Sequence, residues 1–179
     1  MTRPAAGVSV DLGGGAGEPA AVHVVLLEPE IHWNTGNAGR TCLAVGATLH
    51  LVEPLGFQLD ERSVRRAGLD YWPKVDLRVW PSWEAFEGAG LGPPFLISPD
   101  GPRTIWDADL RGAPVLVFGR ESVGLPAPLR ARHADRLFRL PMRAQTVRSL
   151  NLSTSVGVVT YEVLRQNGGL RCREGGWRS

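Results

Sequence analysis

Lysine is almost absent from this sequence, and its charges nearly balance. Of the 20 basic residues only Lys74 is a lysine, the rest are arginines, and the formal net charge of the 179-residue chain is +2. So small a net charge does not by itself indicate a nucleic-acid-binding protein. Arginine binds phosphate through two nitrogens and stacks on bases, so an RNA-binding surface would suit this composition, but a codon bias toward arginine explains it equally well.

Cysteine is also scarce, and long apolar runs are missing. Cys42 and Cys172 give neither a disulfide framework nor a metal-ligand spacing, so we expect a cytoplasmic protein without a bound metal. No segment is apolar over the length of a membrane span, so no membrane association is expected. The glycine-rich residues 1–20 and residues 168–179 are expected to form flexible tails, which leaves residues 21–167 as one domain.

The common signatures of nucleotide-binding and hydrolytic enzymes are missing too. The glycine cluster at 13–17 follows no strand pattern, so it is not a dinucleotide-binding loop, and no phosphate-binding P-loop occurs. No serine–histidine–aspartate elbow is present. His23 and His50 lie inside apolar strand-like runs, which favours packed, hydrogen-bonded core histidines over catalytic ones.

What the sequence does contain is a regular alternation of two patterns. Apolar, β-branched runs predict strands at 22–27, 48–52, 75–79, 95–97, 115–118 and 137–140. Segments of helical character lie at 35–45, 62–67, 82–89, 126–131 and 150–166. Strand alternating with helix predicts an α/β fold, with a mostly parallel sheet covered by helices on both faces.

Three segments that join a predicted strand to a turn and a helix stand out, and we expect the chemistry where they meet. In the first, NTGNAGRT at 34–41, Asn34 lies at a predicted helix start and Arg40 in its first turns. The free N–H groups of a helix start suit a phosphate-bearing substrate. The same residues are also explained if Asn34 or Thr35 only caps the helix and Arg40 is a solvated surface charge.

The second and third segments lie later in the chain. FGRESVGLP at 118–126 presents Gly119 and Glu121 in a tight loop, which indicates close approach of the backbone to a ligand or simply a strand-to-helix turn with a surface glutamate. LPMRAQTVRSLNLSTSVGVV at 140–159 is a loop followed by a long helix that Ser149 can cap, with Asn151 and Ser153 near its start.

Together these segments resemble a known family. NTGNAGR, FGxExxGLP and LPM…SLNLS are similar, in this order and over residues 22–166, to the three motifs of the SpoU-type RNA 2'-O-ribose methyltransferases of the SPOUT superfamily. EPEIHWNTGNAGR, LHLVEPLGF and RRAGLDYW further resemble the small bacterial tRNA wobble-nucleotide 2'-O-methyltransferases, which act on cytidine or uridine. One departure is His32-Trp33, which stands where many relatives carry prolines.

The resemblance implies features that the pattern of elements would not predict. It implies a C-terminal trefoil knot, a homodimer, and S-adenosylmethionine bound in the knotted loops, with a tRNA anticodon stem-loop as partner. The positions that match the family's cofactor site are Ile97, Ser98, Gly119, Glu121, Leu140, Met142, Ser149 and Leu150.

The resemblance also implies a catalytic set, which consists of Asn34, Arg40, Glu121, Ser149 and Asn151. The family usually assigns proton acceptance to the residue at Arg40. Because a guanidinium keeps its proton at neutral pH, we prefer that Arg40 binds and polarises the ribose-phosphate while a phosphate or water takes the proton. Asn34, Ser149 and Asn151 would then orient Arg40 and the loops, and Glu121 would hold a loop or a group of the partner subunit.

Arg65, Arg66, Tyr71 and Trp72 are expected to bind the anticodon stem-loop, since arginine binds phosphate and aromatic rings stack on unpaired bases. Tyr71 and Trp72 are equally explained by hydrophobic packing beside Pro73. Two other functions remain open: 2'-O-methylation of rRNA or of another tRNA position, and RNA binding without catalysis on the same fold.

Overall fold

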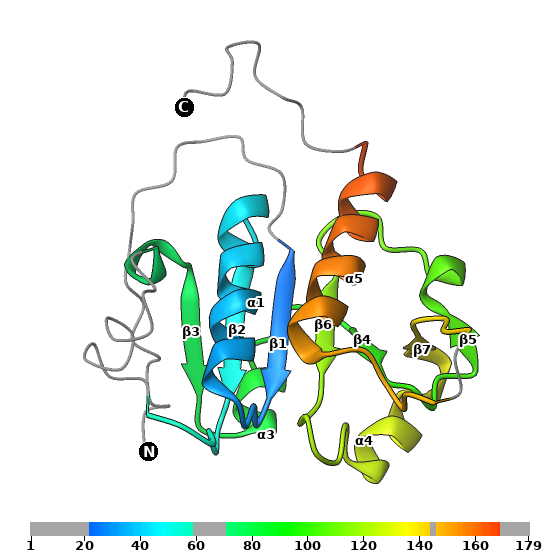
Figure 1. Ribbon diagram of the computed structural model, residues 1–179, viewed down its shortest axis with the longest axis horizontal. Coiled ribbons are helices and arrows are strands. Elements are labelled where there is room, and N and C mark those ends of the chain that lie inside the picture. Colours follow the sequence, from blue (N-terminus) through cyan, green and yellow to red (C-terminus); the bar gives the residue numbers. More distant parts are fainter. Residues whose placement is uncertain (1–21, 59–70, 144–145, 169–179) are drawn as a thin grey trace.

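Seven parallel strands form one sheet in the computed structural model, which describes residues 22–58, 71–143 and 146–168 (Figure 1). The strands are β1 (His23–Leu27), β2 (Thr48–Val52), β3 (Leu77–Trp80), β4 (Pro94–Ile97), β5 (Arg103–Thr104), β6 (Val115–Phe118) and β7 (Leu137–Arg139). Their order across the sheet is β3-β2-β1-β6-β4-β7-β5, and every neighbouring pair is parallel. The expected parallel α/β sheet is confirmed.

Helices lie between these strands, as the sequence predicts. They are α1 (His32–Val45), η1 (Trp72–Lys74), α3 (Trp83–Glu87), η2 (Ile105–Asp107), α4 (Ala127–Arg132), η3 (Ala134–Arg136) and α5 (Leu152–Gln166). Strand β5 was not predicted, because two residues at a sheet edge are too short to show an alternation. The helix predicted at 62–67, the tail predicted at 1–20, all of the tail predicted at 168–179 except Gly168, and Cys172 lie outside the described residues. No helix within the described ranges is long and apolar enough to cross a membrane.

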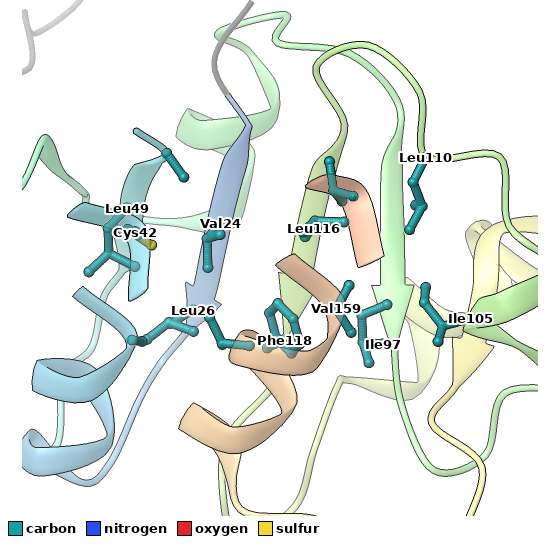
Figure 2. Packing of buried hydrophobic residues seen from close by; sticks show 14 of the residues in the cluster. Val24, Leu26, Cys42, Leu49, Ile97, Ile105, Leu110, Leu116, Phe118 and Val159 are labelled. Carbon is teal, nitrogen blue, oxygen red and sulfur yellow. The ribbon is translucent and has the colours of Figure 1, made fainter. Parts of the chain in front are cut away.

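Side chains of the central strands point alternately into two hydrophobic layers. In β1, Val24 and Leu26 face one layer and Val25 faces the other. The first layer also contains Cys42 of α1 and Val159 of α5 (Figure 2). These two helices pack against each other and lie side by side in front of the sheet in Figure 1.

The second layer covers the opposite face of the sheet. It contains Phe86 of α3 and Leu129 of α4, packed with Val117 of β6 and Leu96 of β4. Helices therefore cover both faces, as expected. Burial on both faces explains why the central strands read as nearly continuous apolar runs, and each fully buried large side chain contributes about 1.5–3 kcal/mol to stability.

Helix α1 starts earlier than the sequence suggests. It begins at His32, and Ile31 at the N-cap position makes no side-chain capping bond. Asn34 and Thr35 therefore lie buried within the first turn, and the alternative that one of them caps the helix is wrong. The helix ends at Gly46, whose φ of 71° is a left-handed conformation that glycine adopts without strain.

Helix α5 has a different cap from the one predicted. It begins at Leu152, and the side-chain oxygen of Asn151 accepts from the backbone N–H groups of Ser153 and Thr154. Asn151 therefore caps this helix, and the prediction that Ser149 does so is wrong. Both residue types suit a cap, and the position at which the chain turns into the helix decides between them.

Two histidines pack within the sheet. His50 of β2 is fully buried, and its Nδ1 accepts a 3.0 Å hydrogen bond from the indole N–H of Trp80. Its Nε2, which must then carry the proton, lies 3.0 Å from Nδ1 of His23 and donates to it. Burial, followed by the nearby His23 and Arg78, lowers the pKa of His50 to about 3. The ring is neutral at pH 7, and the expectation of packed, hydrogen-bonded histidines is confirmed.

Candidate functional site

Loops that follow four neighbouring strands meet at the C-terminal end of the sheet. Strands β1, β6, β4 and β7 are adjacent in that order and parallel, so their C-terminal ends lie together. The three segments identified in the sequence follow β1, β6 and β7, and a fourth loop follows β4 at Ser98. The structure therefore brings the three segments to one place.

A chain of side-chain hydrogen bonds links these three segments. Asn34 of α1 donates from Nδ2 to Oε1 of Glu121 at 3.0 Å. Asn151, before α5, donates from its own Nδ2 to Oδ1 of Asn34 at 2.9 Å. Asn34 is almost completely buried, with 2% of its surface exposed. Asn34 is thus the central member of a polar contact that joins one residue from each segment.

The direction of each hydrogen bond in this chain is fixed. An ionised Glu121 only accepts, so Asn34 must present its NH2 group to Glu121 and its oxygen to Asn151. Asn151 then presents its NH2 group to Asn34, which leaves its oxygen free to cap α5. Every polar atom of the buried Asn34 side chain has a partner, as buried polar groups require.

Two acidic residues after β1 fasten the loop that follows β6. The backbone N–H of Glu30 donates to Oε2 of Glu121 at 2.9 Å. The Glu30 carboxylate in turn accepts from the backbone N–H of Ser122 at 2.9 Å and from its hydroxyl at 2.7 Å. Glu28 forms an ion pair with Arg120. Four contacts therefore hold the β1 and β6 loops together.

The glycines of the β6 loop let it close on itself. The backbone of Arg120 and that of Gly124 bond to each other in both directions, at 3.2 and 2.9 Å. Gly124 has a φ of 72°, and a Cβ on Gly119 would lie 2.3 Å from the carbonyl carbon of Gly124. A side chain at Gly119 would therefore force the backbone to move, and one at Gly124 would be strained by the left-handed conformation. This loop therefore holds Glu121 in a defined position.

A cavity of about 850 Å³ lies among these loops. All eight positions that resemble a cofactor site line it, together with Asn34 and Asn151: Ile97, Ser98, Gly119, Glu121, Leu140, Met142, Ser149 and Leu150. Ser98 is buried, whereas Met142, Ser149 and Leu150 are partly open to solvent. The volume and the mixture of apolar walls with a few polar groups suit a drug-sized ligand that carries both apolar parts and polar atoms.

Arg40 does not line this cavity. It lies six residues after Asn34 on α1, which places it about 120° around the helix and roughly 9 Å along it. Its guanidinium carbon lies 4.6 Å from the ring centre of Tyr71, whose hydroxyl donates to the carbonyl of Gly36 at 3.0 Å. Arg40 is exposed, but the stacking on Tyr71 distinguishes it from a freely solvated charge.

The contacts of Tyr71 and Trp72 support a packing role for both. Each is partly buried against the first hydrophobic layer. The ring of Trp72 lies so close to α1 that a Cβ on Gly39 would come within 2.5 Å of it. The ring of Tyr71 in addition stacks on the guanidinium group of Arg40. Arg65 and Arg66 lie outside the described residues.

Several residues around the site were missed in the sequence. Glu28, Glu30 and Ser122 fasten the loops, and Arg120 and Ile31 line the cavity. Glu28 and Glu30 could have been predicted, because the sequence EPE directly follows a predicted strand. These residues therefore lie at the C-terminal end of the strands, as the three segments do. Their partners could not be foreseen, because the pairing with the β6 loop spans about ninety residues of sequence, as its separations of 91 and 92 positions show.

The part of the chain that contains the three segments resembles known proteins. The sequence model of the SpoU rRNA Methylase family matches residues 21–161. A tRNA (cytidine(34)-2'-O)-methyltransferase of Burkholderia cenocepacia (strain HI2424) is 46% identical over 150 residues, which cover 82% of this chain and 96% of the relative. A protein of Bacillus subtilis (strain 168), to which the same activity is provisionally assigned, is 49% identical over 150 residues, covering 82% of this chain and 93% of the relative.

Solved structures share the fold. One, described as giving structural insights into the 2-OH methylation of C/U34 on tRNA, is 46% identical with a TM-score of 0.76 and covers 83% of this chain and 97% of its own. The SpoU methyltransferase AviRb from Streptomyces viridochromogenes, in complex with the cofactor AdoMet, is 26% identical with a TM-score of 0.66 and covers 83% of this chain and 58% of its own.

Proposed function

The chain belongs to the SpoU rRNA Methylase family, and we infer that it is an S-adenosylmethionine-dependent tRNA methyltransferase that modifies the 2'-hydroxyl of the wobble cytidine or uridine, nucleotide 34. One observation carries this inference. The relatives named for this reaction align with the chain over nearly their whole length, and the family's sequence model matches residues 21–161, which contain the three loops that meet at the cavity.

The eight residues proposed for the cofactor fit S-adenosylmethionine. They surround one cavity whose volume of about 850 Å³ falls within the range of ligand pockets. Ile97, Leu140 and Leu150 would contact apolar parts of the ligand, while Ser98 and the backbone around Gly119 would meet its polar atoms. When bound, S-adenosylmethionine supplies an electrophilic methyl group on a positively charged sulfur.

In the proposed reaction the donor would supply its methyl group to the ribose 2'-oxygen and leave as a neutral thioether, and the 2'-hydroxyl proton would pass to a phosphate oxygen or water. The chain's task is alignment, because an in-line displacement needs its three reacting atoms in a row. Asn34, Glu121 and Asn151 would hold the loops that set this geometry, and Ser149 would act at the rim of the cavity.

Arg40 would bind and polarise the ribose-phosphate of the acceptor nucleotide. Since its side chain stacks on Tyr71 and does not line its own subunit's cavity, we propose that it serves the cavity of a second copy in a homodimer. The exposed outer face of α5, which packs beside α1, is available for such a contact (Figure 1).

The remaining proposals rest on family membership and on the substrate. They are a trefoil knot formed near the C-terminal loops, a methyltransferase domain over residues 21–167, and a cytoplasmic location where tRNA is processed. Arg65 and Arg66 stay proposed contacts of the anticodon stem-loop. For Tyr71 the contacts support an indirect role, in which it positions Arg40.

One experiment tests the function. The protein is incubated with radiolabelled S-adenosylmethionine and either bulk tRNA or rRNA, and the methylated nucleoside is mapped. We expect label in the 2'-O-methyl group of nucleotide 34 of tRNA. Label at another tRNA position or only in rRNA would replace the proposed substrate, and RNA binding without any label would indicate a non-catalytic protein.

A further inference from the structure

Trp33 is the most exposed tryptophan that the structure describes. It lies in the first turn of α1, with 61% of its surface exposed. Trp72, Trp80 and Trp83 are all partly buried and pack against other side chains. An exposed indole ring contributes little to the protein's own core and leaves a large aromatic face available to a ligand.

The position of Trp33 on α1 relates it to the proposed acceptor site. Asn37 and Arg40 follow it by four and seven residues, so the three exposed side chains lie on one face of the helix. We call this the Trp33–Arg40 face. Its ends are separated by two turns, or roughly 10 Å along the axis. At about 3.4 Å per stacked nucleotide, a few nucleotides of one strand span that distance.

Neighbouring rings restrict the movement of the Trp33 indole. The imidazole of His32 meets it edge-on, with ring centres 4.7 Å apart and planes at 65°. His32 in turn meets Phe57, with ring centres 6.5 Å apart. At the other end of the face, Tyr71 supports Arg40. Both ends are therefore ordered before any ligand arrives, which lowers the entropic cost of binding.

The surroundings of Trp33 indicate what would cover it. On α1 the exposed neighbours of Trp33 are the polar residues His32, Asn37 and Arg40, whereas the centre of a protein–protein interface is depleted of charged residues. An aromatic ring and an arginine on one surface are a combination that binds single-stranded nucleic acid. The ring stacks on a base, and the cation binds the backbone.

We propose that Trp33 stacks on an unpaired base that flanks the acceptor nucleotide while Arg40 of the same helix binds the acceptor's ribose-phosphate. This inference rests on the proposed function, because it takes the RNA to be the strand bound by Arg40. The inference does not depend on which subunit binds the cofactor, because Trp33 and Arg40 lie on one face of the same helix. The stacking makes Trp33 a determinant of RNA affinity and leaves the cofactor site unaffected.

The test compares RNA affinity among three variants. Trp33→Ala removes the ring, Trp33→Tyr keeps an aromatic face, and Trp106→Ala removes a second exposed tryptophan, 49% exposed, which lies on η2 and outside the Trp33–Arg40 face. Equilibrium binding to an anticodon stem-loop RNA should weaken about 5- to 150-fold in Trp33→Ala, the range found for loss of one base stack. Trp33→Tyr should recover most of that loss, and Trp106→Ala should bind like the original protein.

Three further measurements separate stacking from other roles. The affinity for S-adenosylmethionine should be unchanged in Trp33→Ala, and the salt dependence of RNA binding should keep its slope, because no phosphate contact is lost. In stem-loops with one abasic site each, a single position next to nucleotide 34 should weaken binding by the original protein and have no added effect on Trp33→Ala.

Each contrary result has a distinct meaning. Unchanged RNA affinity in Trp33→Ala, in a protein that still methylates, overturns the stacking proposal and leaves the proposed function intact. Dissociation of Trp33→Ala into monomers in sedimentation also overturns it, since the ring would then belong to a subunit interface. Affinity that depends on Trp33 without any methylation of the RNA overturns the proposed function and retains the stacking.

Discussion

Asn34 and Asn151 are 117 positions apart in the chain, and the side-chain NH2 group of Asn151 donates a 2.9 Å hydrogen bond to the side-chain oxygen of Asn34. Through Asn34 this bond continues to Glu121, and through Asn151 it continues to the first N–H groups of α5. The first turn of α1, the loop after β6 and the cap of α5 are therefore held together by one chain of hydrogen bonds.

The first prediction concerns this dependence. Asn34→Ala and Asn151→Ala should each lower the free energy of unfolding by about 1–2 kcal/mol, because the first breaks the hydrogen bonds of a buried side chain to Glu121 and Asn151 and the second removes a helix cap. The double variant should lose less than the sum, with a coupling of about 0.5–3 kcal/mol, since both changes break the same bond. Urea denaturation of the four proteins measures the cycle.

A matched control is Asn37→Ala, on the same helix but exposed, which should change stability by no more than about 0.5 kcal/mol. Additive losses at Asn34 and Asn151 would mean that the hydrogen bond between them contributes nothing to stability.

The second prediction tests whether Arg40 acts across a homodimer. Arg40→Ala removes the guanidinium, and Ser149→Trp places a large side chain at the rim of the cavity. Each variant alone should be inactive. When the two are unfolded together and refolded, half of the dimers should be mixed and each should contain one cavity served by an intact Arg40, so about a quarter of the original activity should return.

If Arg40 instead serves the cavity of its own subunit, no mixed dimer contains a complete site and the mixture stays inactive. The control is refolding of each variant with itself, which should restore nothing in either case.

The third prediction concerns pH. The pKa of His50 is about 3 in the folded protein and 6.5 when exposed, so between these values the unfolded chain binds the additional proton. Stability should therefore fall as the pH falls from about 6.5 toward 3, by up to about 1.4 kcal/mol per pH unit from this one group. Denaturation midpoints between pH 7 and pH 4 measure the slope.

His50→Gln should flatten that slope, because a glutamine accepts from Trp80 and donates to His23 without titrating. His32→Gln, a change at an exposed histidine, should leave it as it is. An equal slope in His50→Gln and in the original protein would show that the buried ring is not the group responsible.

The fourth prediction concerns the buried thiol of Cys42. Burial raises its pKa to about 12, so it has almost no thiolate at pH 8. In a Cys172→Ser background, Cys42 should react with a disulfide reagent only as fast as the protein unfolds, and should react at once in concentrated guanidinium chloride. Rapid modification of the folded protein at pH 8 would contradict the burial of Cys42 between α1 and the sheet.

Two pairs of residues show which structural features can be predicted from the sequence and which cannot. Val24 and Val25 face two different apolar layers, so their strand is a continuous apolar run that can be recognised from neighbours along the chain. Ser149 and Asn151 are both good helix caps, and nothing in their local sequence says that α5 begins at Leu152.

The alternating strands and helices and the three loops of the candidate site can be predicted from the sequence, because they depend on apolar runs and on residues a few positions apart. Which side chains meet is set by the three-dimensional fold: Glu30 binds Ser122, Asn34 joins Glu121 to Asn151, and Arg40 stacks on Tyr71 away from its own cavity. Such contacts depend on distances in space between segments remote in the chain, and no local pattern encodes them.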